Sequence, residues 1–152
     1  SISVHFSEIF ETLFPGGKGS LSFTNKTNIL ETGIEISVQP RGKKVKKLSL
    51  LSGGERSLAA IAFLFSIFKS FPSPFYILDE VEAALDDANL HRMINLLDKI
   101  KEDAQYIIVT HQQQTMHAGD VLYGVTMEPG SGSRVFTKTK EDFESLIGTN
   151  EK

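Results

Sequence analysis

Hydrophobic side chains recur along the chain at spacings of three and four residues, which predict helices. One amphipathic helix is expected before Pro15, and another from Leu90 to Ile100. A third helix is expected to start at Ser52 and to run to about Lys69, and its apolar residues predict burial on nearly all sides. A closing helix is expected over residues 143–147.

Other stretches carry the residue types and spacings of β-strands. Alternating or β-rich segments predict two short strands and a final pair, over 21–23, 34–38, 121–127 and 134–138. The continuous apolar runs 75–78 and 106–109 are typical of strands covered on both faces of a parallel sheet. Since a predicted helix separates these two runs, the order favours an α/β fold with a largely parallel sheet flanked by helices.

Composition limits the classes of protein to which the chain can belong. Its 152 residues, 40% apolar and 23% charged, suit one domain or one lobe of a larger one and exclude a disordered tail. The absence of cysteine excludes a disulfide framework and a thiolate metal site. The longest dense apolar run, Leu58–Phe68, is too short to span a bilayer. We therefore expect a soluble intracellular module with no membrane partner.

The charge pattern leaves one local question open. Sixteen basic and 19 acidic residues give a net charge of −3, so no global basic field indicates nucleic acid. From Arg41 to Lys47, however, five of seven residues are basic. This segment is either a solvated loop or a local patch that contacts phosphates, and the sequence favours neither decisively.

The segment Ser52-Gly53-Gly54-Glu55 carries the first candidate chemistry. Ser52 and Glu55 have the spacing of a capping box, and on that interpretation alone an Asp at position 52 would cap as well as Ser. The two glycines weaken a helix but allow a ligand to approach the backbone. A helix start with bare amides and a hydroxyl is suited to a phosphate.

Acidic and basic groups follow the two apolar runs. Asp79 and Glu80 come directly after 75–78, and His111 follows 106–109. The carboxyl ends of parallel strands meet at one edge of a sheet, where open α/β sheets bind ligands. Because adjacent strand residues point in opposite directions, one carboxylate can hold a divalent cation while the other addresses a nucleophile.

These segments occur in the order and spacing of an ABC-type ATPase. Leu51 to Glu55 resembles the signature motif, the strand ending in Asp79-Glu80 resembles Walker B, Ala84-Leu-Asp-Asp87 resembles the D-loop, and His111 resembles the switch histidine. Residues 48–56, 74–89 and 115–127 are closer still to the SMC (structural maintenance of chromosomes) proteins of bacteria, which organise chromosomes. The similarity extends from about Phe6 to about Thr139.

The resemblance implies the C-terminal lobe of an SMC ATPase head, incomplete without an N-terminal lobe that carries the P-loop. Residues 1–14 would end the coiled-coil neck helix, and residues 15–152 would form the lobe. Gly16-Gly-Lys-Gly-Ser20 has the wrong spacing for a P-loop of its own. The isolated chain is therefore expected to be inactive.

In such heads two ATP molecules with Mg²⁺ are held between two subunits, and the resemblance assigns roles accordingly. Asp79 would position Mg²⁺ through water, Glu80 would activate the attacking water, and His111 would contact the γ-phosphate. Asp86 would line the dimer interface. The signature residues would contact the nucleotide of the partner head: Ser52, Gly53, Gly54 and Glu55.

The implied partners are a second SMC head, the N-terminal lobe, a kleisin subunit and DNA, in the cytoplasm on the nucleoid. Two alternatives stay open: a coiled-coil DNA-repair ATPase of the RecN or RecF type, and a scaffold that mainly docks the kleisin. Two positions depart from the family pattern. Glu82 replaces the usual Asp, and Gln112-Gln-Gln114 occupies a place where a basic residue is common.

Overall fold

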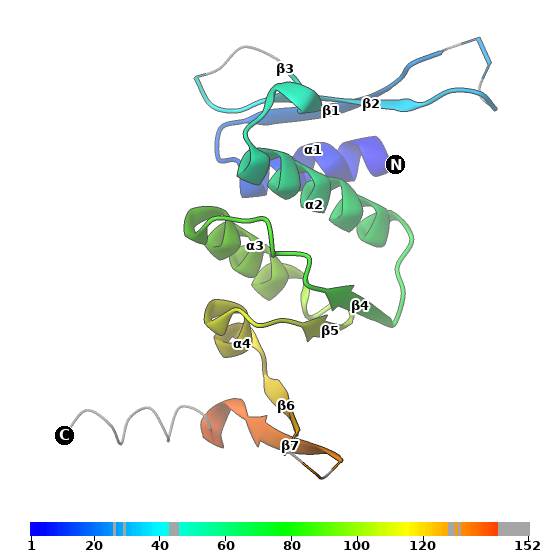
Figure 1. The fold of residues 1–152 in the computed structure, drawn as a ribbon. Helices are drawn as coiled ribbons and strands as arrows, with labels where there is room; N and C mark the ends of the chain where they lie inside the picture. The colour runs from blue at the N-terminus through cyan, green and yellow to red at the C-terminus, as the bar shows by residue number, and fades with distance from the viewer. Residues whose placement is uncertain (26, 29, 43–45, 128–129, 131, 143–152) are drawn as a thin grey trace. The chain divides into compact units, whose positions relative to one another are not determined.

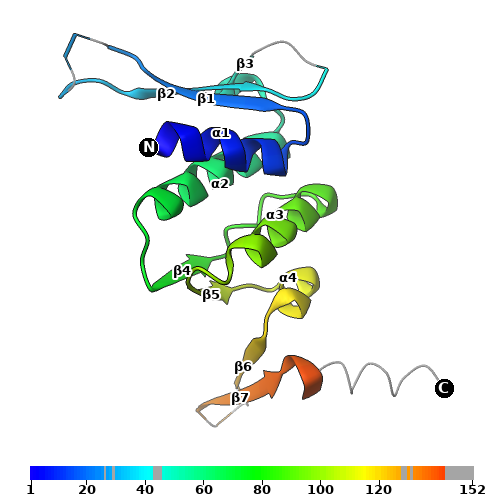
Figure 2. The ribbon, with the colours of Figure 1, turned by 180° about the vertical axis from the view of Figure 1, so that it is seen from behind.

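The computed structural model describes residues 1–25, 27–28, 30–42, 46–127, 130 and 132–142. The chain divides into two compact units, Ser1–Val109 and Thr110–Lys152. Helices α1 to α3 and strands β1 to β5 belong to the first unit, and α4, β6 and β7 belong to the second (Figures 1 and 2).

The first unit begins with a helix that covers a small antiparallel sheet. Helix α1 (Ile2–Leu13) is followed by β1 (Lys18–Phe23), β2 (Ile34–Gln39) and β3 (Lys46–Lys47), paired in the order β1-β2-β3. Phe10 of α1 lies directly against Gly19 of β1, where a Cβ would come within 2.7 Å of the ring carbon Cγ. The predicted first helix and first two strands are confirmed.

Helix α2 (Gly53–Ser70), which follows the short 3₁₀ turn η1 (Leu48–Leu50), packs on the other side of α1 (Figure 1). The fully buried Phe6 ring meets Phe63 edge-on at a centroid distance of 6.3 Å. At the helix surface Lys69 Nζ donates to Glu8 Oε2 at 2.9 Å. Between Leu58 and Phe68 Ala60 alone is exposed and every other residue is buried or half-buried, so the predicted burial of α2 on nearly all sides is confirmed.

The end of the first unit is a strand–helix–strand segment: β4 (Phe75–Asp79), α3 (Asp87–Ile100) and β5 (Gln105–Val109). The two strands pair in parallel, with Asp79 opposite Val109. Tyr76 and Tyr106 stack on each other at 5.3 Å, and Phe68 of α2 stacks on Tyr76 at 4.1 Å. Helix α2 therefore covers this face of the sheet, and burial raises the pKa of Tyr106 to about 12.

The predicted largely parallel sheet is wrong for the part of the chain that the structure describes. Only β4 and β5 pair in parallel, whereas β1–β3 and β6–β7 are antiparallel. The reason is the length of the connections, since a parallel crossover needs about a dozen residues. Residues 24–33 join β1 to β2, and residues 128–132 join β6 to β7.

The predicted burial of β4 and β5 on both faces is also wrong. Side chains alternate along these strands, so one face packs on α2 while the other carries an apolar row: Phe75, Ile77, Ile107 and Val109. All four are exposed, and Ile77 is 64% exposed. Among the described residues of the first unit, none covers this face.

The second unit contains helix α4 (Gln113–Ala118), which the sequence pattern did not predict, and the hairpin β6 (Val121–Met127) and β7 (Ser133–Thr139). The hairpin is antiparallel, with Val121 opposite Thr139, as expected for the final pair of strands. Gly124 leaves room for the Phe136 ring, which would clash with any Cβ there. The closing helix expected over 143–147 lies outside the described residues. Among the helices that the structure describes, none has the length and apolarity needed to cross a membrane.

Candidate functional site

The start of α2 has the predicted capping box. Ser52 Oγ accepts from the Glu55 amide at 3.3 Å, and Glu55 Oε2 accepts from the Ser52 amide at 3.3 Å. The Ser52 hydroxyl also donates to Glu55 Oε2 at 3.2 Å. Ser52 is exposed, so its hydroxyl holds the helix start while it remains accessible to a ligand.

The two glycines at this helix start have different surroundings. A Cβ on Gly53 would meet nothing within 4 Å. A Cβ on Gly54 would lie 3.0 Å from Asn89 Nδ2 and 3.2 Å from Asp86 Oδ2. The sequence predicted that a ligand could approach the backbone at both glycines, and the structure leaves that space open at Gly53. At Gly54 the start of α3 lies close to the backbone, which favours a residue without a side chain.

Asp86, predicted from the resemblance to line a dimer interface, is the N-cap of α3. Its Oδ1 accepts from the Asn89 amide at 2.8 Å, and its Oδ2 accepts from Asn89 Nδ2 at 3.1 Å. Sequence reasoning missed Asn89 as a site residue. The signal was present, because a cap receives its hydrogen bond from a residue two or three positions later.

Asp79 and Glu80 stand exposed at the carboxyl end of β4. Glu80 has φ +47°, a left-handed conformation that is uncommon for a residue with a long side chain. Its backbone is fixed on both sides, since its amide donates to the Val109 carbonyl at 3.0 Å and its carbonyl accepts from the Ala83 amide at 3.1 Å. Such strain typically marks functional positions.

Glu82, the position that departs from the family pattern, is only 2% exposed. Its carbonyl accepts from the Leu85 amide at 2.9 Å, so the turn between β4 and α3 closes around it. The Glu82 side chain is therefore buried, in contrast to the exposed Asp79 and Glu80.

His111 belongs to the second unit, two residues after β5 ends at Val109. Thr110 Oγ1 accepts from the Gln112 amide at 3.0 Å, which turns the chain into α4. The three glutamines that differ from the family pattern therefore form the N-cap and first residues of this helix. His111 itself is exposed. The structure brings Ser52–Glu55 together with Asp86, and it places Asp79 at the end of β4 with Glu80 directly after it.

The acidic side chains at the end of β4 suit one mode of Mg²⁺ binding. Among the described residues no cluster of three or more His, Asp or Glu side chains could hold a metal ion. Mg²⁺ in nucleotide sites is held by one or two carboxylates, and phosphate oxygens and water complete the octahedron. The exposed carboxylates of Asp79 and Glu80 fit that mode and do not fit an all-protein cage.

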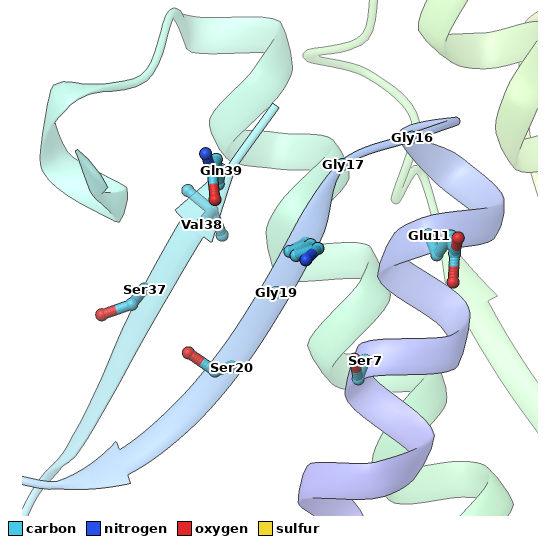
Figure 3. A pocket seen from close by; sticks show the side chains of 10 residues that line it. Ser7, Glu11, Gly16, Gly17, Gly19, Ser20, Ser37, Val38 and Gln39 are labelled. Carbon is cyan, nitrogen blue, oxygen red and sulfur yellow. The ribbon is translucent and has the colours of Figure 1, made fainter. Parts of the chain in front are cut away.

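The glycine-rich segment at residues 16–20 lines a hollow of about 630 Å³ between α1 and the β1–β2 strands (Figure 3). A P-loop lies between a strand and a following helix, whereas Lys18 here already begins β1 and a helix precedes it. The described lining contains one basic side chain, Lys18, and one acidic side chain, Glu11. The structure therefore agrees with the sequence that this segment is not a phosphate-binding loop.

Part of the basic segment 41–47 lies within the described residues. Lys47 Nζ lies 2.7 Å from Glu35 Oε1, and this carboxylate raises the pKa of Lys47. The Arg41 side chain lies against Gly16. Residues 43–45 lie outside the description, so DNA contact by this segment stays a prediction.

Comparison with solved structures defines the class of protein. A structure from work on ATP-driven dimerization and DNA-stimulated activation of SMC ATPases matches with a TM-score of 0.83 and 38% identity, covering 99% of this chain and 91% of that one. An Smc head bound to the C-winged helix domain of ScpA matches with a TM-score of 0.82 and 41% identity, covering 92% of this chain and 43% of that one. The fold is that of an SMC ATPase head.

Residues 12–134 match the family model described as the RecF/RecN/SMC N terminal domain, and the chain belongs to this family. It is 57% identical over 123 residues to the chromosome partition protein Smc of Mycolicibacterium paratuberculosis strain ATCC BAA-968 / K-10. That alignment covers 81% of this chain and 10% of the relative, so the chain spans about a tenth of the length of the curated protein.

Proposed function

We propose that residues 15–152 are the C-terminal lobe of the ATPase head of an SMC chromosome-partition protein, and that residues 1–14 end its coiled-coil neck helix. The observation that carries this proposal is the bare apolar face of the β4–β5 sheet, formed by Phe75, Ile77, Ile107 and Val109. Parallel sheets are normally covered on both faces, and a sheet of two strands has little stability alone.

An N-terminal lobe would cover this face and complete the sheet. Such a lobe would also supply the P-loop, which this chain lacks and which provides most of the phosphate contacts in nucleotide-binding proteins of this kind. The proposal thus explains an exposed apolar surface and a missing motif with one partner.

In the complete head Asp79 would help to hold Mg²⁺, and Glu80 would accept the proton of the attacking water. The bound ion would supply positive charge that stabilises the phosphoryl group during transfer. Because Glu80 is held at φ +47° by hydrogen bonds on both sides, its carboxylate projects from a fixed backbone. His111 would contact the γ-phosphate.

The signature residues act on the nucleotide of a second head. Ser52 would donate its hydroxyl to the γ-phosphate, and the unobstructed Gly53 would let that phosphate approach the helix amides. Glu55 keeps the helix start in place through the capping box, and Gly54 brings Asp86 to the same surface. ATP therefore drives pairing of two heads, with Asp86 beside the interface.

The proposed partners beyond the second head are a kleisin and DNA, on the nucleoid in the cytoplasm. The similar Smc head that was solved in complex with a domain of ScpA supports the proposal of a kleisin partner. The β6–β7 hairpin offers exposed apolar side chains for docking, among them Tyr123 and Val125. This hairpin is the observation that favours a scaffold role alongside the enzymatic one.

Reconstitution with a P-loop lobe tests the function. The purified 152-residue chain is expected to show no ATP turnover, and addition of the N-terminal lobe of a close Smc relative should produce turnover. Turnover by the chain alone would contradict the half-site proposal. A complex that binds the kleisin but remains inactive with ATP would leave the scaffold as the function.

A further inference from the structure

The starts of α2 and α3 meet at one point in the first unit. Gly54, the second residue of α2, lies against the side chains of Asp86 and Asn89, so a Cβ there would push these side chains back by a few tenths of an ångström. Gly53, its neighbour, has open space beside it. The contact is therefore specific to one of the two glycines and joins segments 32 positions apart in sequence.

Asn89 is the buried member of this contact. It is 6% exposed, and both ends of its amide are engaged. The Nδ2 group donates to Asp86 Oδ2 at 3.1 Å, and Oδ1 accepts from Arg92 Nη1 at 3.3 Å. A buried amide with partners at both ends has one favoured orientation, because reversing it would place donor against donor.

The same residue holds both oxygens of Asp86. Its backbone amide donates to Oδ1 at 2.8 Å, and its side chain donates to Oδ2. Asp86 is thereby fixed in a single orientation although it is exposed. Since Gly54 rests on both side chains, the position of the α2 start follows the position of the α3 cap.

We propose that Asn89 is a positioning residue that fixes Asp86 and the start of α2, with Ser52, as one rigid surface for the partner head. This inference rests on the proposed function, in which Ser52 and Asp86 both face the head–head interface. Asn89 is buried, so it is not placed to contact a nucleotide or a metal ion itself. It acts through Asp86 and Gly54, so its loss should uncouple two segments that must meet the partner together.

The first experiment uses the 152-residue chain alone and needs no ATPase activity. Amide hydrogen exchange is measured at Glu55 and Arg56, which donate to Ser52 Oγ and Ser52 O. Gly54→Ala is expected to accelerate exchange of both amides threefold or more, and the matched control Gly53→Ala should leave it unchanged. Asn89→Ala alone should also accelerate exchange of both amides, because it removes the donor that holds Asp86 Oδ2.

The second experiment uses the head reconstituted with a P-loop lobe. Asn89→Asp keeps the shape of the side chain but places an acceptor beside Asp86 Oδ2, and Asn89→Leu removes the polar contacts without that repulsion. Both variants should lower turnover tenfold or more and weaken ATP-dependent pairing. The ATP concentration for half-saturation of each head's own P-loop pocket should stay within twofold of wild type.

The outcomes distinguish a failure of the proposed role of Asn89 from a failure of the proposed ATPase function. Equal exchange in the Gly53→Ala and Gly54→Ala chains would overturn the coupling, whatever the ATPase result. Normal turnover and pairing in Asn89→Leu and Asn89→Asp would reduce Asn89 to a structural residue. A wild-type reconstituted head without turnover would contradict the proposed function, and with it the role at a head–head interface.

Discussion

Substitution of Ser52 tests how far its capping role can be separated from a role toward a partner's phosphate. Loss of the hydroxyl in Ser52→Ala removes the acceptor for the Glu55 amide and should lower the free energy of unfolding by about 1 kcal/mol. Ser52→Asn retains an oxygen acceptor without charge and should leave stability within about 0.5 kcal/mol of wild type, since Asn caps about as well as Ser.

Ser52→Asp behaves differently in the structure from what the capping rule alone predicts. Glu55 Oε2 lies 3.2 Å from Ser52 Oγ, so a carboxylate at position 52 would face a second carboxylate. Two unit charges at that separation repel by about 1.3 kcal/mol at the dielectric constant of water. The expectation that Asp fully restores stability is therefore revised, and the Asp variant should be about as unstable as Ala.

Urea unfolding followed by circular dichroism, at low salt and at 1 M NaCl, distinguishes the two causes. High salt shortens the screening length to about 3 Å, so most of the Ser52→Asp deficit should disappear while the Ser52→Ala deficit stays. An Asp variant as stable as wild type at low salt, or an equal response of both variants to salt, would refute the reasoning. Ser52→Asn is then the neutral, stably capped probe for ATP-dependent head pairing, which it should weaken.

Three further predictions follow from the described geometry. In the reconstituted head Glu80→Gln should keep ATP binding but slow turnover by about 10²–10⁴-fold, as measured in single-turnover assays, and a rate near wild type would place the base elsewhere. Because burial raises the pKa of Tyr106 to about 12 from an unfolded value near 10, the protonated phenol favours the fold, and stability should fall as pH rises from 10 to 12. Tyr106→Phe should flatten that fall in urea titrations, whereas an unchanged slope would assign it to other groups. Gly19→Ala forces a Cβ within 2.9 Å of both Phe10 and Phe6 and should destabilise by about 1–3 kcal/mol in urea, unlike the control Gly53→Ala, whose Cβ would meet nothing within 4 Å.

The helices and strands could be predicted because their signals are local. Each signal depends on a few neighbouring residues: the three- and four-residue spacing before Pro15, the Ser52–Glu55 capping box, and the apolar runs ending at Leu78 and Val109. The structure confirms every one of these elements. Their resemblance to Walker B and signature segments also rested on the order and spacing of local motifs, and the residue roles that it assigns stay predictions.

The remaining features depend on contacts that no local pattern encodes. Apolar residues such as Ile77 indicate that a face needs cover, but not which chain supplies it. The contact of Gly54 with Asn89 follows from how α2 and α3 pack, so sequence reasoning assigned the glycine to a ligand. The left-handed conformation of Glu80 arises from hydrogen bonds to Val109 and Ala83, against the usual preference of glutamate.

The left-handed conformation of Glu80 lowers the stability of the fold at the same residue that is proposed as the catalytic base. A left-handed residue with a side chain costs about 1 kcal/mol or more relative to glycine, which adopts φ +47° freely. Glu80→Gly should therefore fold at least as stably as wild type, with part of the gain lost to the greater freedom of the unfolded chain. Any selection of variants for thermal tolerance alone would favour replacing this glutamate, and the chains it enriched would have lost the proposed base.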